Sequence, residues 1–157
     1  MALNSTTIYG NLTVTGDIKG RRVYGAVYND YAEFRKSAYS YSAGNVVEED
    51  GKGNMILCKT NCSSLAHIVT DTYGMLIGDE KNSIPIAVSG RVLVYYQDDK
   101  VQVGQVVCSD NSGKVRTMSL EEKRNYPECI LGVVSEIPDY ETWGEEPVKG
   151  RIWINLK

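Results

Sequence analysis

The stretch "VGQVVCSDNSGKVRTM" (103–118) decides the fold, because it resembles "AGNVVEEDGKGNMILC" (43–58) at a constant offset. Each stretch has a glycine, one further residue, two valines, an acidic turn that contains glycine, and a second short apolar run. Gly44 and Gly104 are 60 positions apart. Two short β-prone runs on either side of a polar glycine turn are typical of a β-hairpin. We therefore expect two equivalent hairpins.

The same offset relates a second pair of segments. "SGRVLVYY" (89–96) resembles "KGRIWINL" (149–156), so that Gly90 and Gly150 are also 60 positions apart. Two matching blocks at one offset indicate a repeat better than either block alone, although glycines recur in any β protein. The sequence predicts an all-β head, a small barrel or sandwich, built from two related units with the same strand order.

One short helix is expected near residues 119–126. Ser119 is suited to the N-cap, Glu122 stands at the third helical position of a capping box, and Pro127 stops the helix.

Composition limits the class of protein. The chain has 157 residues, of which 24% are charged and 42% hydrophobic, as expected of one soluble globular domain with an appendage. A net charge of -3 without a long basic run argues against a nucleic-acid partner. No apolar run is long enough to span a membrane, and the N-terminus lacks the features of a secretion signal. We expect maturation in a cytoplasm, with no nucleic-acid or membrane partner.

The thiols and the single imidazole do not suggest a metal centre. Cys58, Cys62, Cys108 and Cys129 lack the two close ligand pairs of a zinc site. We expect them to be reduced and mostly buried, and we expect no metal and no cofactor. His67 stands in an apolar run, which favours a packed core residue over a catalytic base.

Apolar and polar residues alternate near the N-terminus, with Ile8, Leu12, Val14 and Ile18 on one face. Such a period of two indicates a strand with one apolar face, and a ribbon this small cannot cover that face itself. We expect residues 1–22 to form an oligomerising strand stalk, with the homotrimer as the assembled state. The alternative is a strand packed on the head of the same chain.

Residues 23–35 join this stalk to the head, which comprises residues 36–157. Within the stretch "VYGAVYNDYAEFRK" we expect Tyr24, Tyr28 and Tyr31 to pack between subunits, because tyrosine combines a large apolar area with a hydroxyl group.

Two acids, Asp30 and Glu33, stand among these aromatic residues. In a strained, dry setting such a pair could cut the Asn29–Asp30 peptide bond. In the alternative, Asp30 caps a turn through backbone N–H groups and Glu33 forms an ion pair with Arg21, Arg22 or Arg35 of the same or a neighbouring chain. We predict the alternative, with the bond intact, because Asn29 offers an amide where a hydroxyl would serve better as a nucleophile.

Two motifs together resemble a known family. They are "DYAEF" (30–34), which follows a stalk rich in Gly, Val and Thr, and "ILGVVSE" (130–136). The family is the C-terminal intramolecular chaperone domain of bacteriophage neck appendages and tailspikes. In that family a β-rich domain helps three chains to wind a fibre, and many members then release themselves by cleavage beside an Asp-Tyr-Ala-Glu motif. The resemblance implies that Asp30 and Glu33 would be the acid pair and Asn29–Asp30 the scissile bond.

Three functions follow as hypotheses. The first is a homotrimeric structural protein of a phage virion, such as a tail fibre, head fibre or decoration protein, made in the cytoplasm of the host bacterium. Its residues 1–22 would attach it to other virion proteins, and it would not be an enzyme. The second is a self-cleaving chaperone that turns over once. The third is a module whose Tyr- and Trp-bearing head binds a glycan of the host surface.

Overall fold

The computed structural model describes residues 6–20 and 29–157. The fold is all β apart from one short helix and one 3-10 turn, as the sequence predicted. In chain order the elements are β1 (Asp30–Lys36), β2 (Val46–Glu49), β3 (Met55–Leu57), β4 (Ala66–Ile68), β5 (Tyr73–Ile77), β6 (Ser83–Tyr95), β7 (Val106–Ser109), β8 (Val115–Thr117), α1 (Leu120–Asn125), η1 (Pro127–Cys129), β9 (Gly132–Glu136), β10 (Thr142–Trp143), β11 (Glu146–Pro147) and β12 (Arg151–Leu156).

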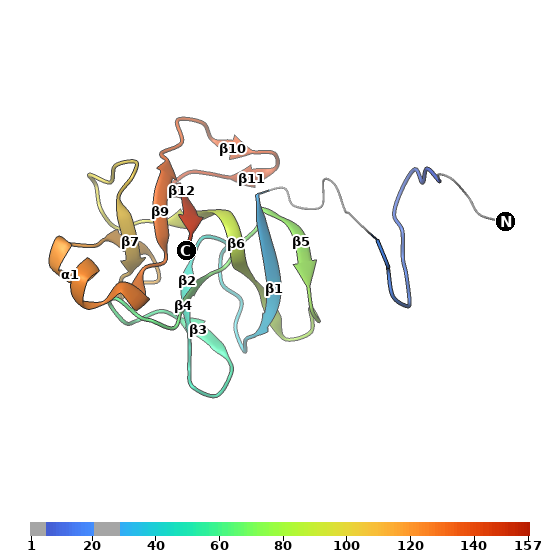
Figure 1. Ribbon diagram of the computed structural model, residues 1–157, viewed down its shortest axis with the longest axis horizontal. Helices are drawn as coiled ribbons and strands as arrows, with labels where there is room; N and C mark the ends of the chain where they lie inside the picture. Colours follow the sequence, from blue (N-terminus) through green and yellow to red (C-terminus); the bar gives the residue numbers. More distant parts are fainter. Residues whose placement is uncertain (1–5, 21–28) are drawn as a thin grey trace.

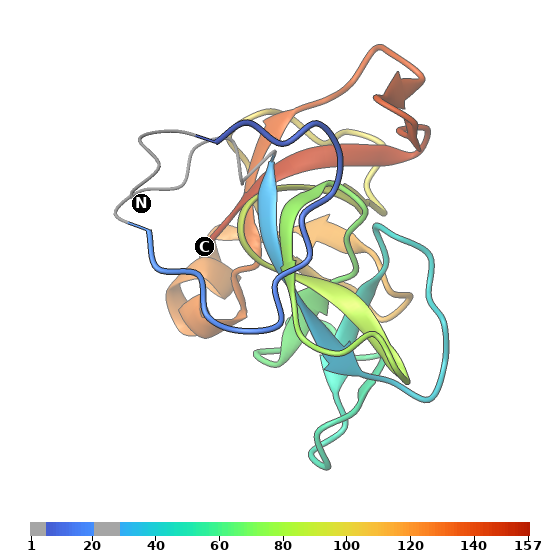
Figure 2. The ribbon, with the colours of Figure 1, turned by 90° about the vertical axis from the view of Figure 1, so that its right-hand side faces the viewer.

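The strands form three sheets. The largest has seven strands in the order β5-β1-β6-β12-β9-β7-β8, a second has the order β3-β2-β4, and β10 pairs with β11. The sheets in the described part of the chain do not close into a barrel, so the barrel alternative was wrong. Figure 2 shows that the β2–β3 and β10–β11 hairpins project from opposite ends of the head.

The main core lies between the two larger sheets. Val46 and Ile68, from the three-stranded sheet, pack with the buried valines and isoleucines of β6 and β12. These strands are dense in β-branched residues, which fit a pleated surface that is buried on its inner face. The centre of the seven-stranded sheet is therefore dry, and residues 152–154 of β12 are fully buried.

The two hairpins are equivalent in hydrogen bonding, which supports the predicted repeat. The Asp50 N–H donates to the Asn54 carbonyl at 3.0 Å, and 60 positions later the Asp110 N–H donates to the Lys114 carbonyl at 2.9 Å. Each turn has a glycine with positive φ, Gly53 or Gly113, directly before the last of these residues. The aspartate carboxylate of each turn also accepts two backbone N–H groups.

The agreement extends to the strands beside the hairpins. The Gly44 N–H donates to the Val69 carbonyl at 2.7 Å, and the Gly104 N–H donates to the Val134 carbonyl at 2.8 Å. The strand order β3-β2-β4 in the first unit matches β8-β7-β9 in the second. Gly44 and Gly104 therefore open equivalent hairpins, as predicted.

Residues 91–95 of β6 pair antiparallel with residues 151–155 of β12. Leu93 faces Trp153 at the middle, Arg91 faces Asn155 at one end, and Arg151 faces Tyr95 at the other. Because the offset of 60 relates Arg91 to Arg151 and Leu93 to Trp153, the two strands are related by an approximate two-fold axis through this central pair.

The glycines at the start of these paired segments are only partly equivalent. Gly90 and Gly150 both have positive φ, of 110° and 77°. Gly150 directly precedes β12, whereas Gly90 lies within β6, which continues for seven residues before it and pairs there with β1. The prediction that both glycines occupy the same bend of the same strand was therefore wrong. The segments that follow the two glycines are nevertheless equivalent.

The predicted helix is α1. Its N-cap Ser119 accepts the Glu122 N–H at 3.1 Å, while the Glu122 carboxylate accepts the Ser119 N–H at 2.9 Å. This is the expected capping box. No helix in the described part of the chain has the length and apolar character needed to cross a membrane.

Residues 6–20 form an N-terminal arm that lies to one side of the head, away from α1 (Figure 1). Every residue of the arm is exposed, and none belongs to a strand. A strand needs a neighbour for its backbone N–H and C=O groups, and in the single chain no described segment lies beside the arm. Because the predicted stalk pairs with other copies of the chain, it stays a prediction. The other residues of the predicted stalk, 1–5 and 21–22, lie outside the described residues.

Candidate functional site

The candidate site is the start of β1, where Asp30 enters the seven-stranded sheet. Asp30 lies between β5 and β6, opposite Tyr73 on one side and Gly90 on the other. Asp30 is fully buried. The register of β1 against β5 shifts by one residue between Asp30 and Tyr31. Its register against β6 shifts by one residue between Tyr31 and Ala32, and such shifts are typical of a β-bulge.

Two threonines supply the polar contacts of this buried carboxyl group. The Thr72 hydroxyl donates to Asp30 Oδ1 at 2.8 Å, and the Thr72 N–H donates to Thr70 Oγ1 at 3.1 Å. Asp30 Oδ2 is buried without a hydrogen-bond partner among the described residues. The predicted cap through backbone N–H groups was therefore wrong, because the side chain points into the sheet and meets hydroxyl groups.

The pKa of Asp30 is raised to about 6, chiefly by burial. The hydroxyl groups of Thr72 and Thr70 act in the opposite direction, and the negative charge of Asp71 raises the pKa further. Taking a carboxylate out of water disfavours its charged form, and two neutral donors offset only part of that cost. Asp30 therefore exchanges its proton near neutral pH, unlike an exposed aspartate.

The Asn29–Asp30 peptide is held tightly against β6. The Asn29 carbonyl accepts the Arg91 N–H at 2.9 Å. A Cβ atom on Gly90 would lie 2.4 Å from the Asn29 oxygen and 2.9 Å from Asp30 Cα, so that only glycine permits this approach. The carbonyl is thus polarised by one fixed N–H donor beside a carboxyl group of raised pKa.

Glu33 does not join Asp30 in the structure. The Tyr31 hydroxyl donates to Glu33 Oε1 at 3.0 Å, and this contact raises the pKa of the Tyr31 hydroxyl. Arg35, one of the expected partners of Glu33, pairs with Glu49 at 2.6 Å. That expectation was therefore wrong for Arg35, because Glu49 of β2 lies closer to the guanidinium.

Glu33 and Arg35 line a groove of about 320 Å³ together with His67. His67 was expected in the core, but its side chain is partly exposed, with Nε2 at 3.4 Å from Glu49 Oε1. Burial and the nearby Arg35 charge lower the pKa of His67. In β4, His67 lies between two buried residues, and its side chain points to the opposite face of the strand from theirs. The apolar neighbours in the sequence therefore led to a wrong prediction of its burial.

The remaining sequence-predicted site residues are separated. The arm carries Ile8, Leu12, Val14 and Ile18, with exposed fractions of 51%, 64%, 43% and 73%. Tyr24 and Tyr28 lie outside the described residues. The structure thus brings Asp30, Tyr31 and Glu33 onto one strand and leaves the arm residues apart from them.

The tryptophans of the head pack inward. Trp153 is fully buried, and its ring meets the Trp143 ring edge-on with centroids 5.5 Å apart. The Trp153 indole N–H donates to the Tyr140 hydroxyl at 2.7 Å, and the Arg91 guanidinium lies over the Trp153 ring at 4.1 Å. This cluster anchors β12. The glycan hypothesis stays a prediction, since Tyr39 and Tyr126 of the head are exposed.

Sequence reasoning missed the residues that surround Asp30. Thr70 and Thr72 lie about forty positions away and carry no pattern that marks them. The 60-residue repeat did single out Gly90 in the sequence. It gave no indication that the backbone of Asn29 and Asp30 packs against this glycine.

In the described part of the chain, no three His, Cys, Asp or Glu side chains come together in a way that could hold a metal ion. No protein-family model, curated protein or solved structure matches this chain.

Proposed function

We propose that the chain is a structural protein of a bacteriophage particle that assembles as a homotrimer through its N-terminal arm. The observation that carries the proposal is the arm itself, in which all residues from 6 to 20 are exposed, including four large aliphatic side chains. The resemblance of residues 30–34 to trimeric phage appendages supports the phage assignment.

The four aliphatic side chains stand at even positions, so that a strand would bring them to one face. Pairing with arms of other copies would satisfy the backbone and bury that face at once. Burial of a few hundred Å² of apolar area per chain would contribute on the order of several kcal/mol, at ~25 cal/mol per Å². That gain opposes the loss of translational and rotational freedom when three chains associate.

Sedimentation of the full chain at micromolar concentration tests the proposal. We expect a species of three times the chain mass of 17.4 kDa. Replacing Leu12 and Val14 with Asp should give lighter species, because charges would enter a dry seam.

The matched control places the same two charges on the other face, as Thr13→Asp with Thr15→Asp. This control should remain a trimer, because odd positions face solvent in the proposed strand. A wild-type chain that sediments as a monomer would overturn the proposal. Equal loss of assembly in both double variants would show that charge on the arm acts without the proposed face.

A second candidate is a single self-cleavage at Asn29–Asp30, and the buried acid favours it. In this hydrolysis a water molecule adds to the Asn29 carbonyl carbon, and the Arg91 N–H meets the developing charge on the Asn29 oxygen. Asp30 gives a proton to its own amide nitrogen, which leaves as the new amine, while the water oxygen becomes part of the new carboxyl group of Asn29. The hydrogen bond from the Tyr31 hydroxyl to Glu33 argues against self-cleavage and for a structural role of Asp30 and Glu33. The resemblance implies Glu33 as the second acid of the pair, and in this structure its carboxylate already binds Tyr31.

Denaturing mass spectrometry of fresh protein, incubated for days between pH 5 and pH 8, decides between the two roles. Cleavage would give fragments 1–29 and 30–157 that Asp30→Asn abolishes. Asp79→Asn makes the same chemical change at an exposed aspartate and should preserve cleavage. A chain that keeps its intact mass throughout would exclude the second candidate.

A further inference from the structure

Two thiols from different units of the repeat lie in direct contact. Cys62 follows β3 in the first unit, Cys108 lies in β7 of the second, and their Sγ atoms are 3.0 Å apart. The two residues are 46 positions apart in the sequence. All four cysteines are free, so that this contact joins two thiols that can react.

Hydrogen bonds fix the Cys62 loop against β7. The Cys62 N–H donates to the Ser109 carbonyl at 3.0 Å, and the Ser63 N–H donates to Ser109 Oγ at 2.8 Å. The Ser109 hydroxyl in turn donates to the Thr60 carbonyl at 2.9 Å. The backbone on both sides of the contact is thereby held. A bond between the sulfurs requires an approach of only about 1 Å.

The two thiols differ in their surroundings. Cys108 is fully buried, and burial together with its contact to Cys62 raises the pKa of its thiol. Cys62 is partly exposed, and its sulfur accepts a hydrogen bond from Arg116 Nη2 at 3.2 Å. The Glu122 carboxylate, 3.7 Å from the same sulfur, is paired with Arg116 at 2.6 Å. Cys62 is thus the more accessible of the two sulfurs, so that an oxidant in solution reaches it first.

We propose that Cys62 and Cys108 form an oxidative modification site, which a small disulfide such as oxidised glutathione closes into an intrachain disulfide. The Cys62 thiolate attacks one sulfur of the oxidant, forms a mixed disulfide and releases one glutathione thiolate. The Cys108 thiol gives its proton to that thiolate, attacks the Cys62 sulfur and expels the second glutathione. Two protein thiols are oxidised, and one oxidised glutathione is reduced to two thiols.

The other two cysteines are not expected to take this role. Cys58 is fully buried, and its thiol donates to the Thr60 carbonyl at 3.4 Å. Cys129 packs in the same cluster as Cys108, but it is nearly buried and burial raises the pKa of its thiol. Cys129 is the competitor that the experiment must distinguish from Cys108.

The test incubates the folded full-length chain with oxidised glutathione, blocks free thiols after unfolding, and maps the peptides by mass spectrometry. We expect the intact mass to fall by two hydrogen atoms, with a Cys62–Cys108 cross-link and with Cys58 and Cys129 blocked as free thiols. A Cys62–Cys129 cross-link, a stable glutathione adduct on Cys62, or no oxidation would each overturn the proposal. Because the readout uses the wild-type chain, it does not depend on whether a variant folds.

Thermal unfolding of the same samples gives a second readout. The cross-link should raise Tm by roughly 5–15 °C, because it closes a long loop in the unfolded chain, and a reducing agent should reverse the gain. Cys62→Ser should abolish the oxidant-dependent gain, whereas the matched control Cys58→Ser should retain it. A gain that persists in Cys62→Ser would show that another reaction stabilises the protein.

Discussion

The first unit, residues 43–96, and the second unit, residues 103–156, have equivalent hairpins and the same order of their first three strands, but they differ in what surrounds their last strands. The last strand of the second unit, β12, lies between β9 and β6 and is six residues long. That of the first unit, β6, is thirteen residues long and uses its extra half to pair with β1.

Both candidate sites lie where the two units differ from each other. The buried carboxyl group of Asp30 meets β6 at Gly90, where the extension begins, and among residues 6–20 and 29–157 no equivalent of β1 lies beside Gly150. The contact of Cys62 with Cys108 likewise joins the units at positions that the offset does not relate. The repeat thus accounts for the scaffold, and its exceptions locate the candidate sites.

The largest expected effect distinguishes the two equivalent glycines. Gly90→Ala should lower the free energy of unfolding by about 3 kcal/mol or more, because its φ is 110° and the new Cβ would meet the backbone of residues 29 and 30. Gly150→Ala should cost only about 1 kcal/mol, since its nearest neighbours would be 3.8 Å away on the Tyr95 ring. Denaturant unfolding measures both. Equal losses would mean that the close approach at Gly90 adds nothing.

The next effect concerns the carboxyl group that exists only beside the first unit. The pKa of Asp30 rises from 3.8 to about 6 on folding, so that the folded state favours the protonated form. Its contribution to stability is complete below pH 4, falls as the pH rises from about 4 to 6, and stays constant above that range. The total change is on the order of 3 kcal/mol, from a shift of about two pKa units.

Asp30→Asn isolates this contribution, because other titrating groups are common to both proteins. The stability of the variant relative to wild type should improve by roughly 2–3 kcal/mol between pH 4 and pH 7.5, whatever constant cost the amide brings. Urea unfolding at the two pH values measures the difference. A pH-independent difference would show that Asp30 titrates as an ordinary aspartate.

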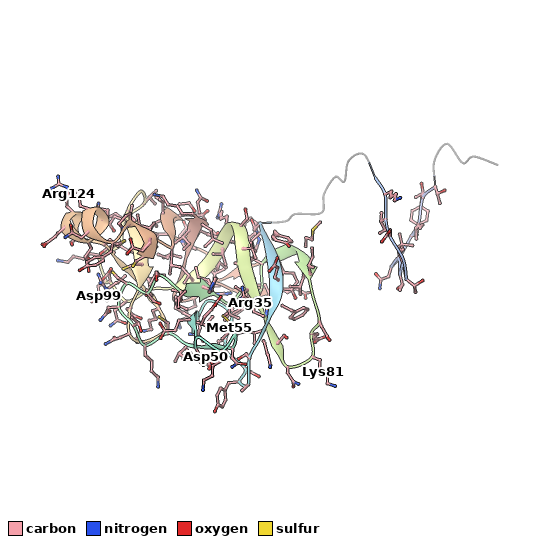
Figure 3. All side chains as sticks on the ribbon, turned by 60° about the horizontal axis from the view of Figure 1, so that its bottom comes forward. Arg35, Asp50, Met55, Lys81, Asp99 and Arg124 are labelled. Atoms are coloured by element: carbon pink, nitrogen blue, oxygen red, sulfur yellow. The ribbon has the colours of Figure 1, made fainter. Side chains whose placement is uncertain are left out.

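The smallest effect compares the two turn aspartates. Asp110 is nearly buried, accepts two backbone N–H groups at 2.8 Å and accepts the Ser112 hydroxyl at 2.6 Å. Asp110→Ala should therefore cost roughly 2 kcal/mol, because buried donors lose their acceptor. Asp50 makes equivalent bonds at the more exposed tip of the β2–β3 hairpin, at the edge of the head in Figure 3, and Asp50→Ala should cost less. The reverse order in Tm would contradict the inference from burial.

Local chemistry made part of this structure predictable. The acidic glycine turns specified both hairpins, and Ser119 with Glu122 specified the start of α1, because in each case the bonded groups lie within a few residues of one another. The 60-residue offset then predicted the equivalent order of the first three strands in each unit, since equivalent sequences fold into equivalent hairpins.

Contacts between distant segments were not predictable in the same way. Asp30 meets Thr72 across 42 positions, and Cys62 meets Cys108 across 46. Neither contact leaves a periodic or spacing signal in the sequence, because each depends on how sheets stack and how strands are ordered. The environment of Asp30, and hence its pKa, could be read only from the folded chain.

The central position of β12 has a consequence for the synthesis of the protein on the ribosome. β12 comprises residues 151–156, yet it pairs with β6 on one side and β9 on the other. Until these residues have left the ribosome, the valines of the strands on either side are exposed to solvent and have no partner strand between them. The nascent chain therefore cannot complete its largest sheet before residue 156 has emerged, and it is prone to aggregate until then.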